Sequence, residues 1–176
     1  MLDVRDSSET KPQSDDPVKT TRRFSVTRTL ETSLPGPLPV ERKHLQVDRV
    51  FTREGTHPFD EIQWERRRAA IGDEKGGEVF AQDNVEVPKS WSMLATNVVA
   101  SKYFYGPLGT RDREYSVKQL VHRVARTIAD WGFKDGYFAS AEDTELFYQE
   151  LAYLCVNQYG AFNSPVWFNV GLHHVY

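Results

Sequence analysis

The sequence predicts a mainly α fold with one small β-hairpin, and two observations lead to this prediction. Three segments after Pro88 repeat apolar residues at the three- and four-residue spacing that gathers them on one helix face. Before them, a turn-forming cluster at residues 73–77 separates two short segments of β-compatible residues. A chain of 176 residues is long enough for one domain with a modest hydrophobic core.

Residues 1–49 are predicted to form a disordered polar tail. They contain five of the nine prolines and, among the aromatic residues, only Phe24. Such a composition buries too little apolar surface to offset the entropy lost on folding. The alternative is a short peptide around residues 24–26 that docks on a partner. We therefore expect the ordered domain to occupy residues 50–160, with residues 161–176 as a distinct closing segment.

The hairpin is expected to pair roughly residues 65–72 with residues 77–83. Its first arm carries three consecutive cations, Arg66, Arg67 and Arg68. We interpret them as a solvated basic face rather than a phosphate site. Binding of nucleic acid through them is disfavoured, because the chain carries a formal net charge of −3.

The first predicted helix follows Pro88 and ends before Gly106. Its apolar residues have the spacing of a single helical face. We expect this face to pack on the rest of the domain. It comprises Trp91, Leu94, Ala95, Val98 and Val99.

The second predicted helix begins at a capping box formed by Ser116 and Gln119. The Ser hydroxyl can accept from the backbone N–H of Gln119, while the Gln side chain reaches back. Gly132 fits a left-handed stop at the C-terminal end. The apolar stripe that should face the core comprises Val117, Leu120, Val121, Val124, Ala125 and Ile128.

The third predicted helix opens at Ser140 and stops at Gly160. Acidic residues in its first turns suit the positive end of the helix dipole: Glu142, Asp143 and Glu145. We expect this helix to bury Phe147, Leu151 and Leu154.

The closing segment, residues 161–176, is rich in strand-forming residues. We expect a strand that starts at or just after Pro165, because proline lacks a backbone donor. Asn163 and Ser164 would then form a polar pair at the mouth of a buried strand. Such a pair can bind a phosphate or a sugar hydroxyl. The alternative is a turn in which both side chains satisfy local backbone groups.

Other chemically capable residues receive plainer interpretations. His173 and His174 could form a metal pair, but neighbouring residues on a strand point to opposite faces, so a frayed terminus is preferred. His122 is predicted to be an ordinary surface or boundary histidine. The single cysteine, Cys155, is predicted to be a buried inert thiol. One cysteine, a polar N-terminus and no long apolar run predict a cytoplasmic protein without a membrane partner.

Five strings of this sequence, taken in order, resemble one protein family over about residues 50–172. They read FTREGTHPFDEIQWERR, VEVPKSWSMLATNVVASKYFYG, REYSVKQLVHRVARTIADWG, DGYF and AFNSPVWFNVG. The resemblance is to the N-terminal region of adenosylcobalamin-dependent, class II ribonucleotide reductases. It implies a helical lobe that leads into the first strand of an α/β barrel whose remainder is missing here, so that residues 161–176 would begin the catalytic barrel.

The resemblance also implies an activity. Members of this family convert ribonucleotides to 2′-deoxyribonucleotides for DNA synthesis through a thiyl radical on a cysteine, and a cysteine pair delivers two electrons. In the wider family, the hydroxyl of a Ser/Thr-Pro element contacts the substrate phosphates. That element corresponds to Ser164-Pro165, so Ser164, and more weakly Asn163, are the implied substrate-binding residues. The choice between a di- and a triphosphate substrate, and a homodimeric state of the full enzyme, stay open.

None of the family's catalytic cysteines matches a position of this chain, because Cys155 lies upstream of them. We therefore expect no catalytic residue here, a cobalamin surface outside the chain, and no turnover by the chain alone. It would be a truncated gene product or one part of a split enzyme, with the rest of the barrel as its partner. The alternative is a stand-alone helical interaction module that pairs strands through an exposed edge at residues 167–176.

Overall fold

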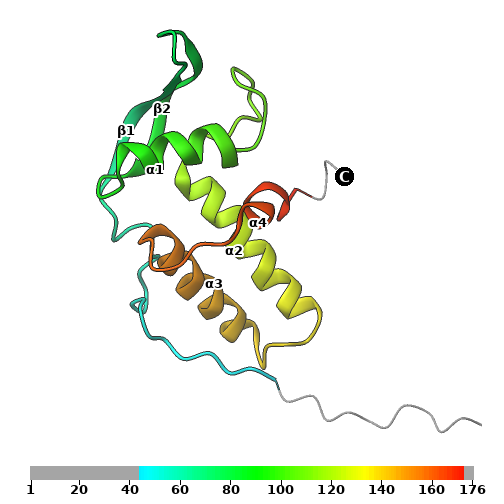
Figure 1. Ribbon diagram of the computed structural model, residues 1–176. Coiled ribbons are helices and arrows are strands. Elements are labelled where there is room, and N and C mark those ends of the chain that lie inside the picture. Colours follow the sequence, from blue (N-terminus) through cyan, green and yellow to red (C-terminus); the bar gives the residue numbers. More distant parts are fainter. Residues whose placement is uncertain (1–43, 173–176) are drawn as a thin grey trace, which may run out of the picture. The chain divides into compact units, whose positions relative to one another are not determined.

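The computed structural model describes residues 44–172, and it shows a helix-rich domain with one antiparallel hairpin (Figure 1). The predicted tail up to residue 43, and His173 and His174, lie outside the described residues. The elements in chain order are β1 (Trp64–Gly72), β2 (Glu78–Pro88), α1 (Met93–Val98), the π-helix η1 (Val99–Tyr103), α2 (Val117–Lys134), α3 (Ala141–Val156) and α4 (Ser164–Asn169).

The predicted hairpin is confirmed, with a longer second arm. β1 and β2 pair antiparallel from Trp64 opposite Pro88 to Gly72 opposite Glu78. Asp73 shapes the turn, because its carboxylate accepts from the backbone N–H of Gly77 (2.6 Å).

The basic arm of the hairpin is only partly a solvated face. Arg68 pairs with Glu78 on the exposed side. Arg67 instead turns inward and donates to the carbonyl oxygen of Trp91 (2.6 Å) and to Oγ1 of Thr96 (2.9 Å). Arg67 therefore ties the hairpin to α1, which the prediction of a solvated face did not anticipate.

The predicted apolar face of the first helix is wrong in two of its members. Leu94 is 74% exposed and Val98 is 39% exposed, while Thr96 on the other side is buried. The observed helix differs from the predicted one in two further features. The helix starts only after the N-cap Ser92, so Trp91 lies outside it. The chain then widens into η1, and a π turn shifts every later residue around the axis.

α2 provides the central face of the core. The capping box at Ser116 is confirmed, and the predicted stripe is buried except for a half-buried Ile128. Gly132 does not end the helix, which continues to Lys134, and Gly136 adopts the left-handed conformation (φ +72°). Gly132 has another role, because a Cβ added there would lie 2.4 Å from Cε2 of Phe138.

α3 packs against α2, and its N-cap Ser140 is confirmed. The predicted core residues Phe147, Leu151 and Leu154 are half-buried, and the fully buried face comprises Thr144, Tyr148, Glu150, Ala152, Cys155 and Val156. The helix ends at Val156 rather than at Gly160. Its left-handed residue is Gln158 (φ 57°), a non-glycine in that conformation.

Residues 44–63, which we call the strap, run past the connection between α2 and α3 and along α3 (Figure 1). Leu45 donates to the carbonyl oxygen of Tyr137 (2.7 Å), and the carboxylate of Glu150 accepts from the backbone N–H groups of Phe51 (2.8 Å) and Thr52 (2.9 Å). These contacts extend the folded part to before the predicted boundary at residue 50.

The strap is also fastened by a hydrogen-bond chain through Tyr148. The backbone N–H of Phe59 donates to Nδ1 of His57 (3.2 Å), so the proton of this imidazole sits on Nε2. Nε2 donates to the hydroxyl of Tyr148 (3.1 Å), which donates to Nδ1 of His122 (2.8 Å). The chain therefore runs in one direction and requires a neutral His122.

Acidification should weaken this fastening. Burial, together with the charges of Arg126 and His57, lowers the pKa of His122, against the opposing pull of Asp130 and Glu145. Below about pH 6.5, His122 is protonated more readily in the unfolded chain than in the folded chain. Its contribution to stability is therefore full above about pH 6.5 and declines below that pH. We expect the urea midpoint to fall between pH 7.5 and pH 5.5.

A His122→Asn variant keeps an acceptor but does not titrate, so its urea midpoint should fall less over the same pH interval. The matched control is His44→Asn, because His44 lies on the strap with its Nδ1 2.9 Å from the carbonyl oxygen of Gly136. An unchanged pH dependence in His122→Asn would contradict the role of this imidazole.

Candidate functional site

The polar pair predicted as a binding site lies at the start of a helix, not of a strand. The strand prediction is wrong, because residues 164–169 form α4. Pro165 in the first turn suits a helix, since its missing N–H would have no partner there. The carbonyl of Asn163 accepts from the backbone N–H of Val166 (3.1 Å), and Trp167 is buried in the core. The helix places the indole of Trp167 in the core, and this burial outweighs the strand propensity of the neighbouring residues.

The two residues of the pair have different surroundings. Asn163 is exposed, and its side chain makes no capping hydrogen bond to α4. Ser164 is half-buried, and its Oγ lies 3.1 Å from the hydroxyl oxygen of Tyr103 in η1. The Ser164 hydroxyl is therefore bonded to a distant side chain, which differs from the turn that was the alternative interpretation.

α4 is held in place by a buried ion pair that the sequence did not reveal. Arg123 of α2 donates to the carboxylate of Glu114 through Nε (2.7 Å) and Nη2 (3.1 Å), and both side chains are 10% exposed. The same guanidinium donates to the carbonyl oxygens of Val170 (2.7 Å) and Trp167 (3.4 Å). Arg123 thus joins α2 to the helix that carries Ser164.

The chain approaches Arg123 closely just after α4. Gly171 adopts the left-handed conformation (φ +81°), and a Cβ added to it would lie 2.5 Å from Cγ of Arg123. The glycine is needed both for its backbone conformation and for this approach. The signal in the sequence was faint: Arg123 stands between the apolar Leu120 and Val124, at the edge of the stripe.

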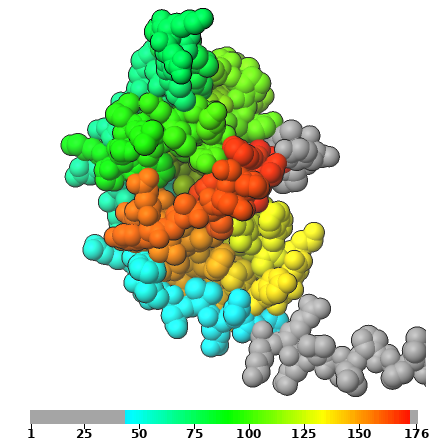
Figure 2. Space-filling view, in the orientation of Figure 1, coloured from blue at the N-terminus to red at the C-terminus, as the bar shows by residue number. Residues whose placement is uncertain are grey.

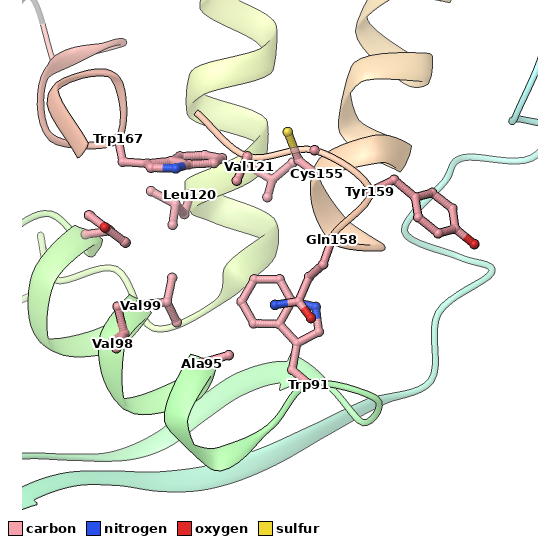
Figure 3. A pocket seen from close by; sticks show the side chains of 13 residues that line it. Trp91, Ala95, Val98, Val99, Leu120, Val121, Cys155, Gln158, Tyr159 and Trp167 are labelled. Carbon is pink, nitrogen blue, oxygen red and sulfur yellow. The ribbon is translucent and has the colours of Figure 1, made fainter. Parts of the chain in front are cut away.

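An apolar cavity of about 360 Å³ opens beside α4 (Figure 3). Its walls come from α1 and η1, α2, the end of α3 and α4, and Trp91, Val99, Leu120, Val121, Cys155 and Trp167 are among the lining residues. Figure 2 shows the surface hollowed where the residues of α1 meet those that follow α3. Cys155 is buried as predicted, and burial raises the pKa of its thiol to about 11.

Large apolar side chains are exposed on the elements that line this cavity. Leu94 and Val98 of α1 are exposed, as are Tyr159 after α3 and Phe168 of α4. We call this surface, together with the cavity, the apolar face. A patch of this kind marks a site of interaction more often than ordinary surface.

Residues 44–172 contain no candidate metal cluster and no helix that could span a membrane. No group of three or more His, Cys, Asp or Glu side chains there could hold a metal ion. None of the described helices combines the length and the apolar composition needed to cross a bilayer.

Removing Arg123 should destabilise the domain strongly, because Glu114 would remain as a buried unpaired charge. For Arg123→Met we expect a loss of about 3–5 kcal/mol in the free energy of unfolding, measured by urea denaturation. The matched control is Arg68→Met, which breaks an ion pair whose Arg side chain is 52% exposed and should shift the midpoint little. Equal midpoints for the two variants would contradict the structural role of Arg123.

Comparison with known proteins gives a consistent family assignment. A family model described as class II vitamin B12-dependent ribonucleotide reductase matches residues 65–106 and 108–158. A vitamin B12-dependent ribonucleotide reductase of Rhodopirellula baltica is 60% identical over 138 residues, which cover 77% of this chain and 13% of that protein. An enzyme of the same name from Streptomyces coelicolor is 50% identical over 130 residues, covering 73% of this chain and 13% of that protein.

More distant relatives bear the same name. The vitamin B12-dependent ribonucleotide reductase of Bradyrhizobium diazoefficiens is 34% identical over 165 residues, covering 75% of this chain and 13% of that protein. The chain thus spans about one eighth of the length of these relatives. With the family model matching more than half of its residues, the chain belongs to the class II vitamin B12-dependent ribonucleotide reductases.

Proposed function

We propose that this chain is the N-terminal portion of an enzyme that reduces ribonucleotides to 2′-deoxyribonucleotides with adenosylcobalamin. The observation that carries the proposal is the 60% identity to a B12-dependent reductase over most of the described residues. The proposed chemistry uses a thiyl radical to abstract the 3′ hydrogen of the substrate. A cysteine pair then supplies two electrons and becomes a disulfide as the 2′ hydroxyl leaves as water.

The residues of this chain bind and position rather than react. Its one thiol, Cys155, is buried in an apolar cavity and belongs to no pair. The cavity of about 360 Å³ lies at the small end of ligand pockets and does not fit a corrinoid with its nucleotide tail. We therefore place the cobalamin site and the reacting thiols on the remainder of the enzyme, and expect the chain alone to be inactive.

We further propose that Ser164 donates a hydrogen bond to a substrate phosphate, with the exposed Asn163 as a second donor. The position of Ser164 supports this role, because α4 holds its half-buried hydroxyl against Tyr103, a residue that lines the apolar cavity. A hydroxyl that donates to an anion contributes more to binding than one that pairs with a neutral group.

A chimera tests this function. The matched region of the Rhodopirellula baltica reductase is replaced by this chain, and deoxynucleotide formation is measured with adenosylcobalamin and a dithiol as the reductant. We expect the chimera to be active and the isolated chain to be inactive. Product formed by the isolated chain would contradict the proposal. So would a folded chimera that binds cobalamin as its parent does and yields no product.

Within the chimera, Ser164→Ala should raise the KM for the ribonucleotide about tenfold or more while kcat changes less, because one donor to the phosphate is lost. Ser101→Ala is the matched control, since the hydroxyl of Ser101 in η1 lies 3.4 Å from the carbonyl oxygen of Val98, the last residue of α1. Equal KM values for the two variants would remove Ser164 from the substrate site.

We propose that the remainder of the reductase covers the apolar face. The relatives are far longer than this chain, and a face built from Leu94, Val98 and Phe168 is costly to leave in water. The alternative was strand pairing through an exposed edge at residues 167–176. In the described part of the chain, residues 167–169 belong to the helix α4 and form no strand edge.

The docking proposal predicts a difference between two equally exposed residues. Leu94 on the apolar face is 74% exposed and Val79 on the hairpin is 70% exposed. In the isolated chain, Leu94→Asp and Val79→Asp should both leave the melting temperature nearly unchanged. In the chimera, Leu94→Asp should lower it by several degrees, because the new charge would be buried, whereas Val79→Asp should not. Equal melting temperatures in the chimera would contradict docking at this face.

A further inference from the structure

We propose that Tyr103 is a positioning residue for substrate binding: its phenol donates to Oγ of Ser164 and so directs the Ser164 hydroxyl proton toward the substrate phosphate. This inference rests on the proposed phosphate contact of Ser164. It assigns a role to a residue whose type and spacing gave no signal in the sequence.

The position of Tyr103 is set by the π turn. In η1 the backbone N–H of Phe104 donates to the carbonyl oxygen of Val99 (3.1 Å), a five-residue step in place of the usual four. Tyr103 is the last residue of this turn. Its ring packs between α4 side chains, with centroid distances of 6.4 Å to Trp167 and 5.3 Å to Phe168. The aromatic contacts hold the phenol oxygen against Ser164.

The backbone of Tyr103 is also joined to that of α4, the helix that begins with Ser164. Arg123 donates to the carbonyl oxygen of Tyr103 (3.4 Å) and to that of Trp167 (3.4 Å). One buried guanidinium therefore fixes the end of η1 and α4 relative to each other. These contacts of Arg123 help to keep the hydroxyl oxygens of Tyr103 and Ser164 3.1 Å apart.

The direction of the hydrogen bond follows from what each group can offer. Each hydroxyl has one proton, so either oxygen could be the donor in the free protein. A phosphate oxygen only accepts. If Ser164 donated to Tyr103, its proton would be unavailable to the phosphate, whereas donation by Tyr103 leaves it free. Donation to Oγ also polarises the Ser164 hydroxyl and strengthens its own hydrogen bond to an anion.

The half-buried position of Ser164 makes its hydrogen bond with Tyr103 more important for binding the phosphate. Ser164 is half-buried and its Oγ contacts the phenol of Tyr103, so Tyr103 supplies one hydrogen bond that would otherwise be left to solvent. Without the phenol, the Ser164 hydroxyl would rotate among several partners. Binding of the phosphate would then have to select one rotamer, which lowers affinity without touching the chemical step.

The test is a double-mutant cycle in the active chimera, with Tyr103→Phe, Ser164→Ala and the double variant. We expect Tyr103→Phe to raise the KM for the ribonucleotide about threefold to tenfold, with kcat within about twofold of the parent value. The double variant should have the KM of Ser164→Ala alone, because Tyr103 acts through Ser164. Inorganic pyrophosphate, as a competitive inhibitor, should lose affinity by the same factor as the substrate.

The matched control is Tyr137→Phe, which removes the hydroxyl of a tyrosine that is 60% exposed between α2 and α3 and should leave KM unchanged. If Tyr103→Phe reduces folding, 3-fluorotyrosine placed at position 103 keeps the ring and provides a stronger donor. It should lower KM, opposite to the effect of the phenylalanine.

Each outcome has a distinct meaning. Multiplicative KM effects in the double variant, or a fall in kcat at constant KM, would overturn the role of Tyr103 and leave that of Ser164 intact. A Ser164→Ala chimera with the parent KM would overturn the phosphate contact itself, and the positioning role with it.

Discussion

The arrangement of the α4 segment depends on the hydrogen-bonding needs of one buried cation. The guanidinium of Arg123 has five N–H donors and no acceptor, and it lies almost wholly out of water. Glu114 neutralises its charge, but a carboxylate alone cannot take all of its donors. The remaining donors are met by carbonyl groups of η1 and of the turn after α4. The segment that presents Ser164 therefore lies where its carbonyl groups can complete the solvation of an arginine.

Around this anchor the domain has two unlike sides. On one side the strap covers α3 with polar contacts, including the carboxylate of Glu150 and the phenol of Tyr148. On the other side, α1 and α4 leave the apolar face open above a cavity. An apolar face with Leu94, Val98 and Phe168 exposed beside a cavity is typical of a surface that contacts another part of a protein.

Local signals explain which features the sequence could predict. The helix starts at Ser116 and Ser140 were correct, because an N-cap depends only on the next few residues. The predicted helix stop at Gly132 was wrong. The glycine is needed there because Phe138 packs against its backbone, a tertiary contact that the local sequence does not reveal. The prediction of a closing strand was wrong for a similar reason. Residues 164–169 form the helix α4, in which Trp167 is buried in the core. The polar residues Asn163 and Ser164 could be picked out by type, but the role of Arg123 could not, because the carbonyl groups it binds at Tyr103 and Val170 lie 20 and 47 residues away along the chain.

The strap has a consequence for the order in which the chain folds during synthesis. Thr52 finds its partner Glu150 only after a separation of 98 residues, whereas the turn at Asp73 closes over four. Contacts of long separation form late, because the intervening loop must first be ordered. Within the described part of the chain, the hairpin and α2 can form while the polypeptide is still emerging from the ribosome. The strap, although made first, must wait for α3 and then docks on a surface already built.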